Sequence, residues 1–368
     1  MTRPGKIRVG LVFGGRSGEH EISIRSARSV VAAIDRARFD LALIGIDRAG
    51  RWHLHNEETF ARLDRDAGAG TSEIIPTAHP DSAATARAGA TEQPMPPVDV
   101  IFPVLHGPYG EDGTIQGLLE MLDLPYVGAG VLGSAVGMDK DVQKRLLRDA
   151  GIPVVPFIAT TEHAWRGAGN AIRRQALELG MPLFVKPANL GSSLGVHKVS
   201  RADELSDAIA DTLSYDCKIL IERGVDAREI ECSVLGNEDP RASVPGEILP
   251  GAEFYSYEAK YSGDSEAALL IPAPLSAELT RAVQTLAVRA FEVTECSGMA
   301  RVDFFLERGT DRVYVNELNT IPGFTSISMY PKLWEASGLG YAELISRLID
   351  LALERHEARN KLRNRGGP

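Results

Sequence analysis

The sequence has few cysteines and no long apolar run, and each absence excludes a class of protein. Its three cysteines, Cys217, Cys232 and Cys296, are widely spaced and form no CxxC pair, which argues against a disulfide framework or a zinc site. No stretch approaches the roughly 18 apolar residues of a membrane-spanning helix, and the opening MTRPGKIRVG lacks the apolar region of a signal peptide. We expect buried free thiols and a cytoplasmic protein with no membrane partner.

Positive charge is also in deficit. The chain has 40 Lys and Arg against 50 Asp and Glu, a net charge of −10. Such a chain repels a phosphate backbone unless its positive charge gathers locally, so nucleic acid is not an expected partner. The 44% apolar and 24% charged residues are typical of soluble globular proteins. A length of 368 residues suits two or three domains, each with its own core.

The order of the apolar runs predicts an α/β fold at the N-terminus. Residues 6–13 read as a strand that stops at a glycine turn, and apolar residues at helical spacing follow over 22–34. Runs at 41–46 and 98–105 are further strands, which favours a largely parallel sheet. Residues 62–97, rich in Ala, Thr, Gly and Pro, show little periodicity. We interpret them as a variable insertion or loop without chemistry.

A glycine-rich sequence at residues 128–133, GAGVLG, matches the GxGxxG pattern of dinucleotide-binding folds. Such a site needs an acidic residue at the end of the second strand. The candidate acid, Asp149, lies instead inside a helical pattern that ends at Gly151, so we favour a tight turn. A Walker A sequence is absent, and a nucleotide site would need another design.

Dispersed residues could supply that design. Lys140 stands near a helix start and Lys186 near a strand end, and six residues after Lys186 comes the turn GSSLGV. Its glycine permits close approach of backbone N–H groups to a phosphate, and Ser192 and Ser193 add hydroxyl donors. The alternative is a pair of surface lysines beside an ordinary hairpin turn.

Two runs near the C-terminus place carboxylates on strand faces. In ARVDFF, the strand period of two puts Arg301 and Asp303 on one face. In VYVNELN it puts Glu317 and Asn319 on one face and Asn316 on the other. If the runs pair as a hairpin, two carboxylates and an amide oxygen converge beside a guanidinium, a donor set suited to Mg²⁺. The alternative is a solvated sheet face with an ordinary ion pair.

Three loops add candidates for binding a small substrate. The turn NTIPGFTSIS could present the N–H groups of Gly323 and Met329 and the hydroxyl of Ser328 to an anion, or be only a loop. In GGRSGEHEIS, Glu19 could cap a helix or anchor an ammonium group. His106 in HGPYGEDG could be a packed residue or a substrate contact.

Taken in order, the motifs resemble one family, the D-alanine–D-alanine ligases of the ATP-grasp superfamily. The resemblance covers about residues 7 to 350 and rests on GGRSGEHEIS, HGPYGEDG, GMDK, FVKPANLGSSLGV, ILIE, EIECSVLGN, YEAKY, ARVDFF and NELNTIPGFTSIS. Each motif alone is weak, whereas their shared order is specific.

The resemblance implies an N-terminal α/β substrate domain at 1–124, a central ATP-grasp domain at 125–221 and a C-terminal catalytic ATP-grasp domain at 222–356, the last two being α+β, before a frayed tail at 357–368. It implies ATP and D-alanine as substrates, two Mg²⁺ ions with Mn²⁺ as a substitute, and a homodimer. The activity implied is ligation of two D-alanines through a D-alanyl phosphate, which supplies peptidoglycan synthesis.

The resemblance also assigns roles by position. Phosphate contacts fall to Lys140, Lys186, Lys260 and Ser193. Adenine and ribose contacts fall to Glu222 and Glu229. Magnesium ligands are Asp303, Glu317 and Asn319. The first D-alanine is held by Glu19, His106, Arg301 and the Gly323 N–H, and the second by Ser192, Tyr261, Ser328 and the Met329 N–H.

A lid over the acyl phosphate is assigned to the segment around YSYEAKY, with Gly251 and Gly263 as hinges. Two rival functions stay open. A D-alanine–D-lactate ligase typically has a histidine in place of Tyr261, which is a tyrosine here. A non-catalytic nucleotide-binding regulator would tolerate loss of Arg301 or of a magnesium ligand, and none is missing.

Overall fold

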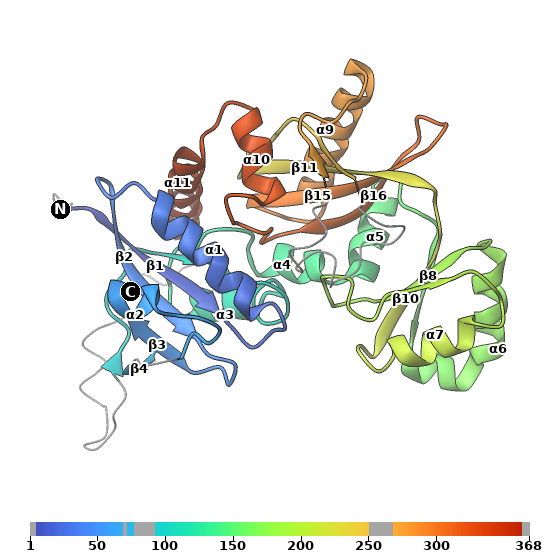
Figure 1. Ribbon diagram of the computed structural model, residues 1–368, viewed down its shortest axis with the longest axis horizontal. Helices are drawn as coiled ribbons and strands as arrows, with labels where there is room; N and C mark the ends of the chain where they lie inside the picture. The colour runs from blue at the N-terminus through green and yellow to red at the C-terminus, as the bar shows by residue number, and fades with distance from the viewer. Residues whose placement is uncertain (1–4, 69–71, 77–92, 250–267, 363–368) are drawn as a thin grey trace.

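The computed structural model describes residues 5–68, 72–76, 93–249 and 268–362. Three sheets follow one another along the chain, as Figure 1 shows from blue through green to red. Helices of the described residues cover the sheets, and none of these helices has the length and apolar character needed to cross a bilayer.

The first sheet has the strand order β5-β4-β3-β2-β1-β6. Its strands are β1 (Ile7–Gly14), β2 (Phe39–Ile46), β3 (Trp52–His55), β4 (Ser72–Ile75), β5 (Gln93–Pro94) and β6 (Val100–Pro103). The predicted parallel pairing holds for β2-β1-β6. Strand β3 is antiparallel to both β2 and β4, whereas β4 and β5 are parallel. The β2–β3 pairing follows from a tight turn in which Asp47 accepts the N–H groups of Ala49 and Arg51.

The interpretation of residues 62–97 as a structureless insertion was wrong for part of the segment. Strand β4 extends the sheet beyond β3, and the side chains of Leu63, Ala67, Ile74 and Met95 are buried. Short-range periodicity was weak because β4 and β5 contribute few residues each. Residues 69–71 and 77–92 lie outside the described part of the chain.

Helices of the N-terminal region are α1 (His20–Ala33), α2 (Glu57–Ala61) and α3 (Thr114–Met121). Helices α4 (Val131–Met138) and α5 (Lys140–Asp149) follow the glycine-rich turn. Asp149 is the last residue of α5, and Gly151 beyond it has a φ of +70°, a conformation that favours glycine after a helix. The dinucleotide interpretation is therefore excluded.

The second sheet is antiparallel, with the order β7-β10-β8-β9. Its elements are β7 (Phe157–Thr161), α6 (Glu162–Glu178), β8 (Leu183–Pro187), β9 (His197–Val199), α7 (Leu205–Thr212) and β10 (Lys218–Arg223). Buried residues of α6 and α7 pack with these strands in one hydrophobic cluster.

The third sheet is also antiparallel, with the order β14-β13-β11-β15-β16 and β12 paired to β11. It comprises β11 (Ala227–Gly236), β12 (Arg241–Ala242), β13 (Gly246–Leu249), β14 (Ala268–Leu270), β15 (Gly298–Glu307) and β16 (Val313–Asn319). Helix α9 (Ala277–Val293) packs on one face of this sheet.

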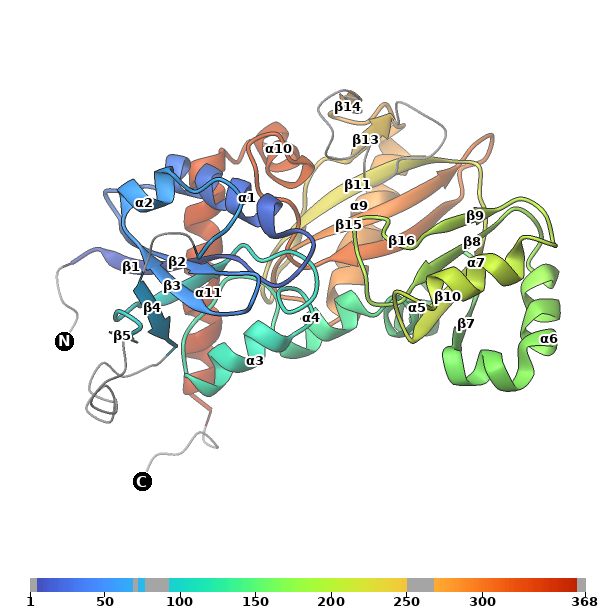
Figure 2. The same ribbon diagram turned by 60° about the horizontal axis from the view of Figure 1, so that its bottom comes forward.

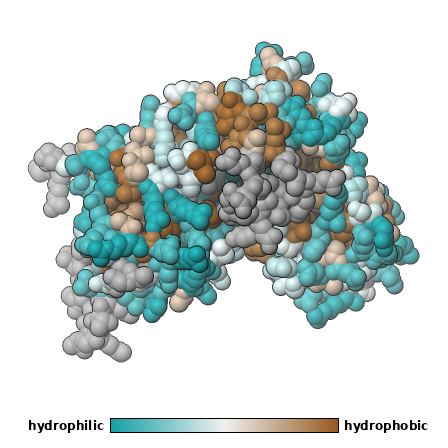
Figure 3. Space-filling view, in the orientation of Figure 1, coloured by the Kyte–Doolittle hydropathy of each residue, from teal (hydrophilic) through white to brown (hydrophobic). Residues whose placement is uncertain are grey.

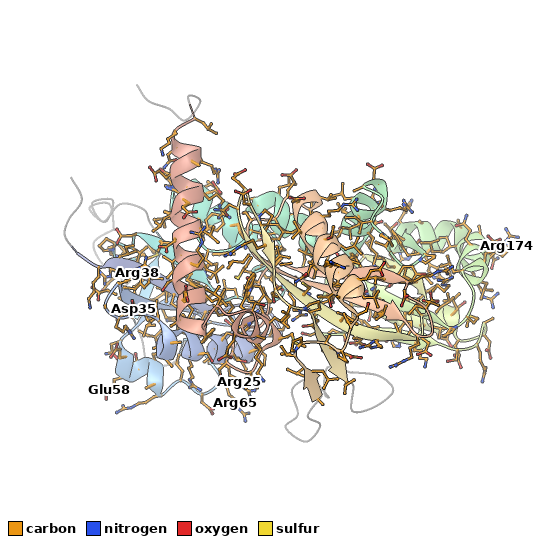
Figure 4. All side chains as sticks on the ribbon, turned by 90° about the horizontal axis from the view of Figure 1, so that it is seen from above. Arg25, Asp35, Arg38, Glu58, Arg65 and Arg174 are labelled. Atoms are coloured by element: carbon orange, nitrogen blue, oxygen red, sulfur yellow. The ribbon has the colours of Figure 1, made fainter. Side chains whose placement is uncertain are left out.

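Helices α10 (Met329–Ala336) and α11 (Tyr341–Asn360) return the chain to the first sheet. Figure 2 shows α11 running beside that sheet, and its buried Leu344, Ile345 and Leu348 share a core with β1. Arg38, labelled in Figure 4, donates to Asp350 of α11 at 2.8 Å.

Two sequence-based expectations need correction. The tail was expected to fray from residue 357, but α11 continues to Asn360, because Arg359 pairs with Glu120 and holds the last turn. Cys217 was expected to be buried, and it is exposed, whereas Cys232 and Cys296 are buried.

Phe324 connects the turn before α10 to the first sheet. It is fully buried, and its ring lies 5.7 Å from that of Phe102 and 5.6 Å from that of Tyr341. We predict that Phe324→Ala lowers the free energy of unfolding by about 3 to 5 kcal/mol, because it removes an aromatic side chain from a packed core. Chemical denaturation measures the change. Leu362→Ala, which shortens an exposed side chain, is the control and should change stability by less than about 0.5 kcal/mol.

Candidate active site

A hairpin of the third sheet carries the acidic end of the site. Strands β15 and β16 pair so that Asp303 faces Glu317 and Arg301 faces Asn319. Arg301 donates from Nε and Nη2 to the two carboxylate oxygens of Asp303, both at 2.7 Å, and Asn319 Nδ2 donates to Asp303 Oδ2 at 3.0 Å. The Glu317 carboxylate lies 3.3 Å from Lys140 Nζ. These side chains therefore converge as the strand period indicated.

One assignment to a strand face was wrong. Asn316 was expected to face away from Glu317, yet its Oδ1 accepts a hydrogen bond from Lys186 Nζ at 3.3 Å. A register shift between Asp303 and Phe304 leaves Asn316 without a partner position on β15, and this irregularity changes which way the side chains of β16 alternate. Asn316 therefore joins the cluster around Lys186.

A second cluster lies between α5 and the second sheet. Glu222 at the end of β10 contacts Lys186 Nζ at 2.8 Å and Lys144 Nζ at 3.1 Å. Burial alone would raise the pKa of Glu222, but the two ammonium groups outweigh it and the pKa is lowered. Burial also lowers the pKa of Lys144 to about 8 despite the attraction of Glu222.

Lys144 was missed by the sequence analysis, which treated its helix only as a structural unit. The signal was present, because Lys140 and Lys144 are four residues apart and lie on one face of a helix. Asp139 caps this helix, accepting the N–H groups of Asp141 and Val142 at 3.1 Å. The capped helix start fixes where Lys140 emerges, and Lys140 donates to the carbonyl of Leu190 at 2.8 Å.

The glycine-rich turn after β8 has an unusual backbone. Ser192 and Ser193 have φ values of +53° and +59°, in the left-handed region that non-glycine residues rarely adopt. Consecutive residues held there point to a constraint set by function more than by folding. The Ser192 hydroxyl donates to Glu19 Oε1, which joins this turn to the N-terminal region.

Glu19 does not cap α1, although it occupies the N-cap position. Its carboxylate lies against two glycines, since a Cβ added at Gly107 would come within 2.7 Å of Glu19 Oε2 and one at Gly191 within 3.8 Å. Burial and the nearby Glu19 raise the pKa of Glu111 to about 8. Glu111 accepts the N–H of Gly107 at 2.8 Å.

His106 links the first sheet to the turn before α10. It is buried, with Nδ1 3.1 Å from the carbonyl of Ile321 and Nε2 3.1 Å from Ser26 Oγ. Burial lowers its pKa, although Glu19 opposes that shift. In the same turn, Ser328 Oγ accepts the N–H of Thr325, and a Cβ at Gly323 would meet Ser328 Oγ at 3.1 Å. Met329 begins α10.

Glu229 lies on β11, opposite Phe305 of β15. Lys260, Tyr261 and the lid segment with Gly251 and Gly263 lie outside the described residues. In Figure 3, the apolar surface on this face gathers near the centre of the molecule, where Figure 1 places α10 and β11.

The acidic hairpin offers oxygen donors that suit a magnesium ion. Within the described residues, no group of three or more His, Cys, Asp and Glu side chains is placed to hold a metal. Asp303, Glu317 and Asn319 instead offer two carboxylates and one amide, all oxygen donors. Magnesium commonly takes one or two carboxylates and completes its shell with phosphate oxygens and water, so these residues fit the ion.

Two models of one protein family match most of this chain. The family model described as the D-ala D-ala ligase N-terminus matches residues 8–129, and the model of the D-ala D-ala ligase C-terminus matches residues 146–350. The chain belongs to the D-alanine–D-alanine ligase family. The matched residues include the turn with Ser192 and Ser193, Lys186 and the β15–β16 hairpin.

Individual relatives agree along the whole chain. D-alanine–D-alanine ligase A of Salmonella typhimurium is 50% identical, covering 97% of this chain and 99% of the relative, and that of Escherichia coli K12 is 48% identical over the same shares. The solved ligase from Coxiella burnetii matches with a TM-score of 0.83 at 40% identity, covering 97% of this chain and 96% of its own. A D-Ala:D-Ser ligase from Enterococcus faecalis matches with a TM-score of 0.81 at 32% identity, over 95% and 100%.

We predict that nucleotide affinity depends on the charge of Lys144. Below pH 8, Lys144 and Lys186 outweigh Glu222 by one positive charge. As the pH rises through about 8, Lys144 loses its proton and the cluster becomes neutral, so the affinity for ADP should fall roughly three- to tenfold by pH 9.5. Isothermal titration calorimetry measures the change. Lys144→Arg keeps its charge and should show a flat profile; a fall of equal size in this variant would contradict the prediction.

Proposed function

We propose that this protein joins two D-alanines to D-alanyl-D-alanine at the expense of ATP, as an ADP-forming ligase that supplies peptidoglycan synthesis. The proposal rests on two contacts, which involve the acidic hairpin, the glycine turn and the N-terminal region. Lys140 contacts Glu317 of the acidic hairpin, and Ser192 of the glycine turn contacts Glu19 of the N-terminal region. A phosphate-binding end and an amino-acid-binding end thus share one site.

The chemistry explains why both ends are needed. A carboxylate is a poor electrophile, so the γ-phosphoryl group of ATP is first transferred to the carboxylate of the first D-alanine, which releases ADP and gives D-alanyl phosphate. The amine of the second D-alanine then displaces phosphate. Lys140 and Lys186 offset the charge of the phosphates. Glu222 accepts from the adenine amino group, and Glu229 binds the ribose. Asp303, Glu317 and Asn319 would hold Mg²⁺, as two ions with Mn²⁺ as a substitute, and the bound metal would supply positive charge that offsets the charge of the phosphate oxygens.

The amino acids bind at the opposite end. Glu19 binds the ammonium group of the first D-alanine beside His106. Arg301 and the Gly323 N–H hold its carboxylate and then the oxyanion that forms when the second amine attacks. Because Glu111 is protonated below pH 8, it adds no negative charge beside Glu19. Ser192, Ser328 and the Met329 N–H shape the second site with Tyr261, while Ser193 and Lys260 bind phosphate.

We predict that Asp303→Asn or Glu317→Gln lowers the turnover number at least about a hundredfold, because each removes a charge that serves the phosphoryl transfer. Phosphate release with ATP, Mg²⁺ and D-alanine measures turnover, and thermal melting serves as the control for folding. The melting temperature should change little. Equal losses of activity and of folding would support a structural role for the carboxylates.

The same assay tests the function itself. Phosphate release should rise strongly when D-alanine is added, and D-alanyl-D-alanine should appear by mass spectrometry. Phosphate release unaffected by D-alanine would favour a nucleotide-binding regulator. A preference for D-lactate or D-serine as the second substrate would contradict dipeptide formation.

We propose that the protein assembles as a homodimer. A cytoplasmic location remains a prediction. A surface depression of about 530 Å³ lies beside α3, α4 and α11, which neighbour one another in Figure 2. At or near it, Met121 and Leu132 expose 88% and 60% of their area. Its rim carries charges of both signs, Glu120, Glu295, Arg355 and Arg359. Such a surface can complement itself across a two-fold axis.

We predict that Leu132→Asp converts the dimer to a monomer, because it places a charge in the apolar part of the interface. Sedimentation velocity at micromolar concentration measures the change. Ile75→Asp on β4, another exposed apolar position, should leave the dimer intact. A wild-type chain that sediments as a monomer would contradict this assembly.

A further inference from the structure

Arg301 is paired with two carboxylates, of which the proposed mechanism uses one. Its Nε lies 2.7 Å from Asp303 Oδ1 and 3.0 Å from Glu231 Oε2. Glu231 on β11 is in register with Asp303 on β15, so the two carboxylates stand side by side on one face of the sheet. Both are largely buried, Glu231 with 6% of its area exposed.

A second Arg–Glu pair, whose arginine lies on β11 with Glu231, shows how many carboxylates a structural ion pair needs. Arg228 on β11 donates to both carboxylate oxygens of Glu247 on β13, at 2.8 and 2.7 Å. One carboxylate gives this guanidinium a bidentate partner. Asp303 already gives Arg301 the same arrangement. Glu231 is therefore in excess of what a structural pair requires.

The excess is explained if Asp303 has another task. Both carboxylate oxygens of Asp303 accept hydrogen bonds from Arg301, and Oδ2 also accepts one from Asn319. A metal ligand must turn oxygen lone pairs toward the ion, and this weakens its bonds to the guanidinium. A buried guanidinium that loses its only carboxylate is left as an uncompensated charge, which is strongly unfavourable. Without Glu231, metal binding at Asp303 would have to overcome that cost.

We propose that Glu231 is a positioning residue that keeps the Arg301 guanidinium paired and oriented while Asp303 binds the divalent ion. The inference rests on the proposed function, in which Asp303 is a metal ligand and Arg301 holds the substrate carboxylate. Glu231 Oε2 lies 3.0 Å from Nε, at the inner end of the guanidinium, and accepts the Nε–H when Asp303, its present acceptor, turns to the metal. The terminal nitrogens then stay directed at the substrate as Asp303 turns to the metal.

The test is the affinity for Mn²⁺ in the presence of ADP, followed by electron paramagnetic resonance of the free ion. Glu231→Gln should weaken Mn²⁺ binding roughly tenfold, because Asp303 is then the one carboxylate left of the two that contact Arg301, and it releases the guanidinium less readily. Glu247→Gln is the matched control, since it removes a buried carboxylate from Arg228, which lies on the same strand as Glu231. It should leave the Mn²⁺ affinity within about twofold of wild type.

Kinetics supply a second measurement on the same variants. Glu231→Gln should raise the KM for D-alanine and leave the KM for ATP nearly unchanged, because Arg301 contacts the amino acid. If Glu231→Gln does not fold, as judged by thermal melting, Glu231→Asp replaces it; this variant keeps the charge one methylene farther away and should show a smaller weakening.

The outcomes separate the two proposals. If wild type binds Mn²⁺ with ADP and Asp303→Asn abolishes binding, the metal site stands. Wild-type affinity in Glu231→Gln, or an equal loss in Glu247→Gln, would then overturn the role of Glu231 alone. If Asp303→Asn binds Mn²⁺ as wild type does, the metal assignment fails first, and the role of Glu231 fails with it.

Discussion

The pairing of β15 with β16 is the constraint on which the site depends. It sets Asp303 opposite Glu317 and Arg301 opposite Asn319, and backbone hydrogen bonds hold these positions whatever the side chains do. Two carboxylates so close together repel each other unless cations lie beside them. Arg301 and Lys140 provide these cations from the strand and from the start of α5. Burial alone would lower the pKa of Arg301, but the nearby carboxylates outweigh it and keep that pKa well above its usual value, so its charge is permanent.

Charge balance also organises the nucleotide end. Glu222 is buried between Lys144 and Lys186, and each of the three would be unstable there alone. The cluster joins α5 to the strands β8 and β10, so the helix that presents Lys140 is tied to the sheet that presents Lys186. The same side chains thus serve the fold and prepare a positive surface for polyphosphate.

Much of this arrangement could be predicted from sequence, where local rules sufficed. The strand period placed Arg301 with Asp303, and the helical pattern placed Lys140 near a helix start. The irregularity at Asn316 could not be predicted, because it depends on how β16 aligns with its neighbour. Glu231 and Lys144 were missed because their roles depend on ion pairs with distant residues. Glu231 pairs with Arg301, 70 residues away, and Lys144 with Glu222, 78 residues away. Strands β4 and β5 were missed because each is too short to show a period.

The return of α11 to the first sheet has a consequence for biosynthesis. The apolar face of β1 and α1 is completed by Leu344, Ile345 and Leu348, which are synthesised after the strands of the second and third sheets. The strands of the first sheet therefore keep part of their apolar surface uncovered until α11 has been synthesised. Nascent chains with such uncovered surface are prone to aggregate and are natural clients of chaperones.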